Sequence, residues 1–144
     1  MRVQLRMSYE MNRQLQADSG LSLADYDVLV VLSGVGDEGI RLSAVAAQIG
    51  WERSRLSHQL RRMEERGLTE RHTCPDDGRA TNVALTVKGR RAIVEAAPGH
   101  VDLVRGLFFD PLPEHLLESF TEALEHIHVN LDLNSSIPPA PRQE

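Results

Sequence analysis

The 144-residue sequence has one cysteine, few aromatic residues and no long hydrophobic run. The single cysteine, Cys74, cannot form a disulfide within the chain and cannot supply a cysteine-rich metal site. No apolar run approaches the ~18 residues that a membrane-spanning helix needs, and residues 1–6 lack the continuous apolar core of a signal peptide. These absences exclude disulfide scaffolds and membrane proteins, and we expect a cytoplasmic globular protein of one domain.

Charge is unevenly distributed along the chain. The net charge of −5 is unfavourable for contact with a nucleic acid. However, residues 51–91 carry 10 Lys or Arg against 6 Asp or Glu, whereas residues 1–50 carry 4 against 6 and residues 92–144 carry 2 against 9. Of the 16 basic residues 15 are arginine, whose planar guanidinium makes paired hydrogen bonds to phosphates and guanine edges. A GC-rich coding bias explains the arginine content equally well.

Apolar residues recur at helical spacing in the first third of the chain. A four-residue repeat predicts an amphipathic helix over residues 2–17. Ser22, with Asp25 three residues later, is typical of a capping box at the start of a second helix. The apolar run 28–32 predicts that this second helix is buried.

Two short helices joined by a tight turn are expected next. The first covers residues 43–49 and ends at Gly50, and the second runs to Arg66 and stops at Gly67, which is a helix-turn-helix arrangement. The side of the second helix away from its apolar residues is polar and basic: it holds Ser54, His58, Arg61, Arg62 and Glu65, with Arg55 and Ser57 on its flanks. Because a recognition helix places its base-reading side chains near its N-terminal end, we expect this face to contact double-stranded DNA.

Residues 68–86 predict a β-hairpin. Threonine-rich segments at 68–74 and 81–86 flank a tip of Pro, Asp and Gly at 75–79. A hairpin that directly follows a helix-turn-helix is a wing. The sequence therefore predicts a mainly α fold with a small β-hairpin wing.

The last third of the chain predicts two more helices. Thr86 can cap the first, which Pro98–Gly99 should kink or interrupt. The second is amphipathic and starts with Pro113 at or near its first position. Residues 134–144 form a polar, proline-containing tail that we expect to be disordered.

Five short strings occur in a recognisable order: Leu21-Ser22-Leu23, Ser54-Arg55-Leu56-Ser57, Met63-Glu64-Glu65-Arg66-Gly67-Leu68, Asp77-Gly78-Arg79 and Leu85-Thr86-Val87-Lys88-Gly89-Arg90. Together they resemble the MarR family of bacterial winged helix-turn-helix transcription regulators over about residues 2–130. The resemblance implies one domain at residues 1–133. It places a DNA-binding lobe at about 22–91 and dimerisation helices at about 2–20 and 92–133.

The family resemblance also implies a mode of action. It suggests a homodimer on a pseudo-palindromic operator, more often a repressor than an activator, which a small-molecule effector could release. It implies that Arg79 enters the minor groove and that Asp77 holds the wing in place, in agreement with the negative potential of a narrow minor groove. One departure is Glu52, which stands where a Ser or Thr cap is common and is a poorer cap.

Several residues keep two interpretations at this point. Met7, Tyr9 and Met11 could line an effector pocket, although their spacing is ordinary for helix packing. Cys74 has no second cysteine to resolve an oxidised form and no evident cause of a low pKa, so a structural role is the simpler interpretation.

Two alternatives to DNA binding remain open from the sequence. A metal-responsive regulator would use a set of acids and histidines at spacings of three and four: His115, Glu118, Glu122 and His126. A winged-helix protein-interaction module without a DNA role is the other alternative. The sequence has no phosphate loop, nucleophile elbow or paired metal-ligand motif, so we expect neither an enzyme nor a bound cofactor.

Overall fold

Helix caps fix where two of the helices begin. The Ser22 hydroxyl accepts a hydrogen bond from the Asp25 amide at 3.0 Å, and the Asp25 carboxylate accepts one from the Ser22 amide at 2.8 Å, which completes the predicted capping box. The Thr86 hydroxyl accepts a hydrogen bond from the Gly89 amide at 3.0 Å. Both predicted caps are therefore confirmed.

A computed structural model describes residues 1–74 and 77–134, with the side chains of residues 74, 77–80 and 132 outside the description. The elements of the described chain are α1 Arg2–Ser19, α2 Leu23–Ser33, β1 Ile40–Arg41, α3 Leu42–Ile49, α4 Arg53–Glu65, β2 Thr69–Cys74, β3 Asp77–Leu85, α5 Val87–Val104, the π-helical segment η1 Arg105–Phe109, and α6 Glu114–Asn134. This mainly helical architecture with a small sheet confirms the predicted fold class. The predicted tail lies outside the described residues, except for Asn134, which ends α6.

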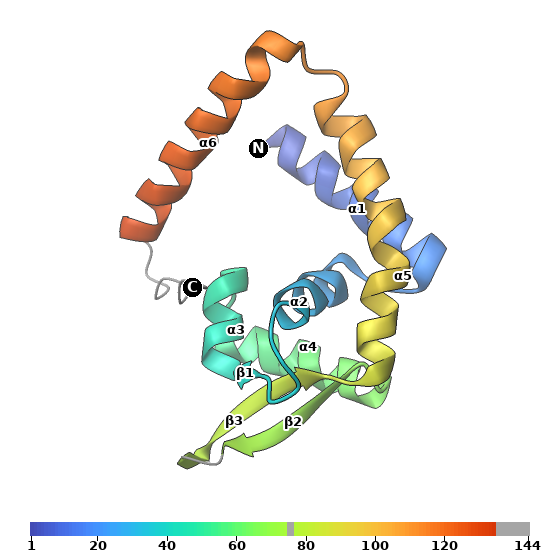
Figure 1. Cartoon of the computed structure of the whole chain (residues 1–144), viewed down its shortest axis with the longest axis vertical. Helices are drawn as coiled ribbons and strands as arrows, with labels where there is room; N and C mark the ends of the chain where they lie inside the picture. Colours follow the sequence, from blue (N-terminus) through green and yellow to red (C-terminus); the bar gives the residue numbers. More distant parts are fainter. Residues whose placement is uncertain (75–76, 135–144) are drawn as a thin grey trace.

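The elements form a winged lobe and a set of terminal helices. Figure 1 shows α2, α3, α4 and the sheet gathered at one end, α1 lying beside α5, and α6 folding back from the far end of α5 and standing apart. The core lies where the lobe meets α1 and α5, and its largest fully buried side chains include Leu15, Leu29, Leu56, Leu60 and Val83. Helix α6, by contrast, exposes most of its apolar side chains.

The sheet has three antiparallel strands in the order β1-β3-β2. Ile40 of β1 pairs with Val83 of β3, and Thr69 of β2 pairs with Leu85. Strand β1 has no predicted counterpart, and the second wing strand starts at Asp77 rather than at the predicted residue 81. The wing is therefore longer than predicted and is anchored at its base by an additional strand.

Helix α5 runs without interruption through Pro98 to Val104, so the predicted interruption is wrong. A proline inside a helix removes one amide donor, and Pro98 lies on the exposed side of α5. The adjacent buried positions Ala96 and His100 hold the helix against its neighbours. The irregularity occurs instead at η1, directly after α5. No helix in the described part of the chain is long and apolar enough to cross a membrane.

Candidate DNA-binding site

The turn between α3 and α4 sets the orientation of the candidate recognition helix. Gly50 ends α3 with φ of 74°, a left-handed conformation that favours glycine, and the Trp51 amide then donates to the Ala46 carbonyl at 2.9 Å. Leu56, Leu60 and Met63 of α4 are fully buried. The opposite side of α4 must therefore face solvent.

The predicted contact residues do lie on that outer side. The structure brings together on one exposed surface Ser54, Arg55, His58, Arg61 and Arg62, while Ser57 is half-buried at its edge. Part of this surface is hollowed into a shallow groove beside the start of α2, which Ala24, Trp51 and Gln59 help to line. A polar and basic surface of this kind matches the edges and phosphates of a major groove.

Arg55 is held in place by an aromatic ring. Its guanidinium carbon lies 4.2 Å from the centroid of the Trp51 ring, and Trp51 is itself only 9% exposed. Burial raises the pKa of the nearby Asp27 carboxyl, and the positive charge of Arg55 opposes that rise. The sequence analysis identified Arg55 but not Trp51, because a cation–π contact has no spacing signature of its own.

A buried polar chain supports the other end of the exposed surface. The Asp25 carboxylate accepts hydrogen bonds from the Gln59 amide nitrogen at 2.6 Å and from the Arg66 guanidinium at 2.7 Å. Gln59 in turn accepts a hydrogen bond from Arg62. Sequence reasoning missed this chain, because its members come from α2 and α4.

The wing is joined to α4 by a residue of β2. The Arg71 guanidinium donates to the Glu64 carboxylate at 2.5 Å and to the Ser57 carbonyl at 3.3 Å. These bonds fix the base of the wing relative to the recognition helix. The two predicted wing contacts, Asp77 and Arg79, have side chains outside the described part of the structure, as does Cys74.

Helix α4 begins without a side-chain cap. Glu52 occupies the cap position, and its side chain accepts no hydrogen bond from the first turn. The amides of that turn thus lack the partner that a Ser or Thr would provide, and a negative charge stands beside them.

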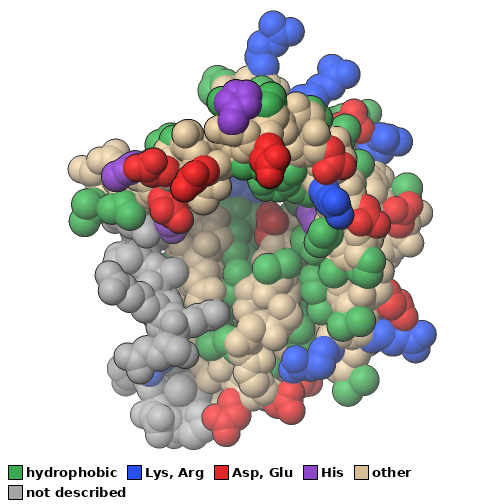
Figure 2. Space-filling model, turned by 45° about the horizontal axis from the view of Figure 1, so that its top comes forward, with side chains coloured by type: hydrophobic (Ala, Val, Ile, Leu, Met, Phe, Trp, Pro, Cys, Tyr) green, Lys and Arg blue, Asp and Glu red, His purple; other side chains and the backbone are tan. Residues whose placement is uncertain are grey.

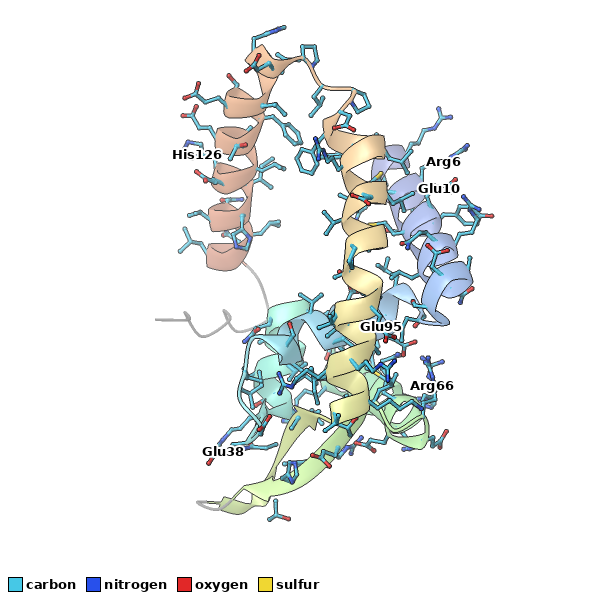
Figure 3. The ribbon with its side chains drawn as sticks, turned by 45° about the vertical axis from the view of Figure 1, so that its right-hand side comes forward. Arg6, Glu10, Glu38, Arg66, Glu95 and His126 are labelled. Atoms are coloured by element: carbon cyan, nitrogen blue, oxygen red, sulfur yellow. The ribbon has the colours of Figure 1, made fainter. Side chains whose placement is uncertain are left out.

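The candidate effector residues separate in the structure. Met7 lines a groove along α1 together with Leu103, Leu107 and arginine side chains, whereas Tyr9 is 64% exposed and lines a different groove. Met11 is half-buried and lines neither of these grooves. Figure 3 shows Arg6 and Glu10, two lining residues, projecting from the side of α1 that faces away from α6.

The candidate metal ligands lie along the exposed helix α6. His126 and Glu122 approach to 4.0 Å. Within residues 1–74 and 77–134, no three His, Cys, Asp or Glu side chains are grouped so that they could hold a metal ion.

The exposed recognition helix, its supporting helices and the wing define a winged helix-turn-helix protein of the DNA-binding class. A sequence model of the MarR family matches residues 19–80. The crystal structure of Sco3205, a MarR family transcriptional regulator from Streptomyces coelicolor in complex with DNA, is 31% identical with a TM-score of 0.87, and the match covers 97% of this chain and 91% of that one. The chain belongs to the MarR family: it is a DNA-binding transcription regulator and not an enzyme.

Two further crystal structures extend the comparison. AbsC, another MarR family regulator from Streptomyces coelicolor, is 35% identical with a TM-score of 0.84, and the match covers 90% of this chain and 87% of that one. CouR from Rhodococcus jostii RHA1, bound to p-coumaroyl-CoA, is 32% identical with a TM-score of 0.72, covering 88% of this chain and 86% of that one.

Proposed function

We propose that the protein is a homodimeric, sequence-specific repressor that binds a pseudo-palindromic operator through α4 and the wing. The observation that carries the proposal is the exposed polar and basic face of α4. In this assignment Ser54, Arg55, His58 and Arg61 face the bases, with Ser57 at the edge of the contact. Arg62 binds a phosphate, and Arg79 enters the minor groove with support from Asp77. Residues of about 22–91 form the DNA-binding lobe.

The experiment is a fluorescence titration of labelled genomic fragments at several salt concentrations. Arg79→Ala is expected to weaken binding and to reduce the slope of log affinity against log salt by roughly one per subunit. Arg91→Ala is the matched control, because Arg91 is an exposed arginine of α5 paired with Glu95 at 2.6 Å. Equal slopes for the wild type and Arg79→Ala would refute the wing contact, and salt-insensitive binding by the wild type would refute DNA binding itself.

We assign the terminal helices, at about 2–20 and 92–133, to the dimer. They expose many apolar side chains, each between 43% and 66% exposed: Val3, Leu5, Leu107, Phe109, Leu116, Leu124, Ile127 and Leu131. Exposed apolar surface of this extent is typical of an interaction site. Figure 2 shows acidic side chains and hydrophobic patches across the part of the surface formed by α6.

The charges of these helices are complementary. Helix α6 contains Glu114, Glu118, Glu122 and Glu125 and no Lys or Arg. The groove along α1 is lined by Arg2, Arg6 and Arg13, by Glu10, which pairs with Arg13 at 3.1 Å, and by apolar side chains. A second copy of the chain offers an acidic apolar helix to a basic apolar groove, which favours association between copies.

Sedimentation velocity tests the dimer. Leu124→Glu adds a charge to the exposed apolar side of α6 and is expected to give a monomer. The control Val87→Glu adds the same charge at a residue that is 89% exposed in the first turn of α5, and it should leave the dimer intact. A dimer for Leu124→Glu would contradict the assignment of α6.

We include a small-molecule effector in the proposal. The support is the likeness to CouR bound to p-coumaroyl-CoA.

A further inference from the structure

Asp25 is a buried carboxylate whose oxygens accept hydrogen bonds from three donors of the protein. It is 3% exposed, and its oxygens accept hydrogen bonds from the Ser22 amide, the Arg66 guanidinium and the Gln59 amide nitrogen at 2.8, 2.7 and 2.6 Å. The first of these bonds caps α2, whereas the other two come from Gln59 in α4 and from Arg66, the residue directly after α4. Asp25 thus joins the start of α2 to the recognition helix.

Gln59 connects Asp25 to the exposed side chain of Arg62 through two hydrogen bonds. It is 4% exposed, donates through its amide nitrogen to Asp25 and accepts through its amide oxygen from Arg62. A carboxylate only accepts hydrogen bonds and a guanidinium only donates them. Asp25 and Arg62 therefore require the same orientation of the Gln59 amide. If the amide were reversed, its oxygen would face the acceptor Asp25 and its nitrogen would face the donor Arg62.

Arg62 is the exposed end of the chain of hydrogen bonds. It lines the groove beside Ser54, Arg55 and His58, on the face assigned to DNA. A free arginine side chain samples many rotamers and loses that freedom when it binds a phosphate. The bond to Gln59 restricts Arg62 before DNA arrives.

We propose that Asp25 and Gln59 are positioning residues that hold Arg62 in the orientation in which it binds a DNA phosphate. The inference rests on the proposed DNA contact of α4. Pre-orientation of one side chain changes affinity by about 2- to 10-fold per subunit. Neither Asp25 nor Gln59 needs to touch DNA for this effect.

Asp25→Asn is the informative substitution. The side-chain oxygen of the new asparagine must face the two donors, the Ser22 amide and the Arg66 guanidinium. The side-chain nitrogen of the new residue then faces Gln59. Gln59 must then turn its own oxygen toward residue 25 and its nitrogen toward Arg62, where donor meets donor. We therefore expect Asp25→Asn, which replaces one buried oxygen by nitrogen, to break the hydrogen bond between Gln59 and the exposed guanidinium of Arg62.

A double-mutant cycle in the full-length protein tests this coupling. The affinity for one duplex, selected from genomic fragments by the wild type, is measured for the wild type, Asp25→Asn, Arg62→Ala and the double variant. Asp25→Asn is expected to weaken binding by about 2- to 10-fold per subunit in the wild type and to have no further effect once Arg62 is alanine. In the control cycle with Arg61→Ala, the two losses should multiply, because Arg61 is not part of the hydrogen-bond chain.

The outcomes separate the inference from the proposed function. An equal loss from Asp25→Asn with and without Arg62 would mean that Asp25 acts only through the fold, which overturns the positioning role and leaves DNA binding intact. Absence of salt-sensitive DNA binding by the wild type would overturn the proposed function itself. Thermal unfolding of each variant checks that it is folded. If Asp25→Asn does not fold, Gln59→Met breaks the chain at its centre while Asp25 keeps Ser22 and Arg66, and the same cycle with Arg62 applies.

Discussion

Replacement of Gly89 by alanine is expected to destabilise the junction between the wing and α5. An added Cβ at this position would lie 1.9 Å from the Leu68 carbonyl oxygen and 3.3 Å from a methyl carbon of Leu85. The Leu68 carbonyl cannot easily withdraw, since it accepts hydrogen bonds from the amide and hydroxyl of Thr86 at 3.2 and 3.3 Å. To accommodate the alanine, the backbone before β2 therefore has to move away from α5 by more than an ångström.

The magnitude follows from two opposing effects. Forcing extra volume into a packed site costs about 1–3 kcal/mol and occasionally more, while alanine gains up to ~1 kcal/mol over glycine in a helix. With so short a contact the upper part of the first range applies, and we expect a net loss of about 2 kcal/mol. For a chain of this length that corresponds to a fall in Tm of roughly 4–8 °C.

Urea and thermal unfolding followed by circular dichroism measure the loss, at one fixed protein concentration because a dimer's stability depends on it. Gly36→Ala is the control, since a Cβ there meets no atom within 4 Å and the exposed residue lies outside the terminal helices assigned to the dimer. The control should keep or slightly raise the stability. Wild-type stability for Gly89→Ala would show that α5 and the wing are not packed as described.

Three further predictions concern single side chains. Glu52→Ser should raise the free energy of unfolding by about 1 kcal/mol by capping α4, whereas Glu52→Gln, which removes the charge without adding a good cap, should not; equal stability of the two variants would contradict the capping explanation. Burial lowers the pKa of His100 below 6.5, so below about pH 6.5 the unfolded chain takes up a proton that the folded chain does not, and stability falls as the pH falls. His100→Phe keeps a ring against Tyr26, 4.4 Å away, and should flatten that decline in urea unfolding between pH 7.5 and 5.5; an unchanged slope would refute it. Trp51→Leu should weaken DNA binding by about 2- to 5-fold per subunit through loss of the contact with Arg55, but it should have little effect in an Arg55→Ala background in the same titration.

Local sequence signals were sufficient for the starts of α2 and α5, for the end of α3 and for the exposed face of α4. The Ser22 and Thr86 caps act within three residues, and Gly50 ends α3 through its own backbone conformation. The buried and exposed sides of α4 follow from a period of 3.6 residues once the helix exists. Such features depend on neighbours in the sequence, and so they could be predicted from it.

Features made by distant residues could not be predicted in this way. Strand β1 is only two residues long and exists because Ile40 pairs with Val83, which follows 43 positions later. The Asp25–Gln59 hydrogen bond joins residues 34 positions apart, and Gln59 would otherwise be read as one more polar residue on α4. Only the packing of α2 against α4 brings its amide to a buried carboxylate.

Long-range hydrogen bonds also link the terminal helix α1 to the recognition helix α4. Helix α1 is tied to α2 by a hydrogen bond from the Leu23 amide to Asn12 at 2.9 Å, and α4 is tied to the corner between them by Arg66, which donates to Gly20 at 2.8 Å as well as to Asp25. Figure 3 shows Arg66 beside the lower half of α5, far from α6. We therefore expect a rotation of α1 to carry α4 with it instead of bending the lobe.

In the proposed dimer, the length of α1 amplifies such a rotation. Its 18 residues span roughly 27 Å, so a turn of about 5° at the subunit interface moves the lobe by roughly 2 Å. Two recognition helices must lie about 34 Å apart on DNA, and hydrogen bonds do not tolerate an error of 2 Å. An effector that releases DNA should thus change the distance between spin labels on the two copies of α4 and leave the distance between labels on α2 and α4 of one subunit unchanged. A change within the subunit alone would show that the lobe deforms, and the rigid coupling through Arg66 and Asp25 would then be wrong.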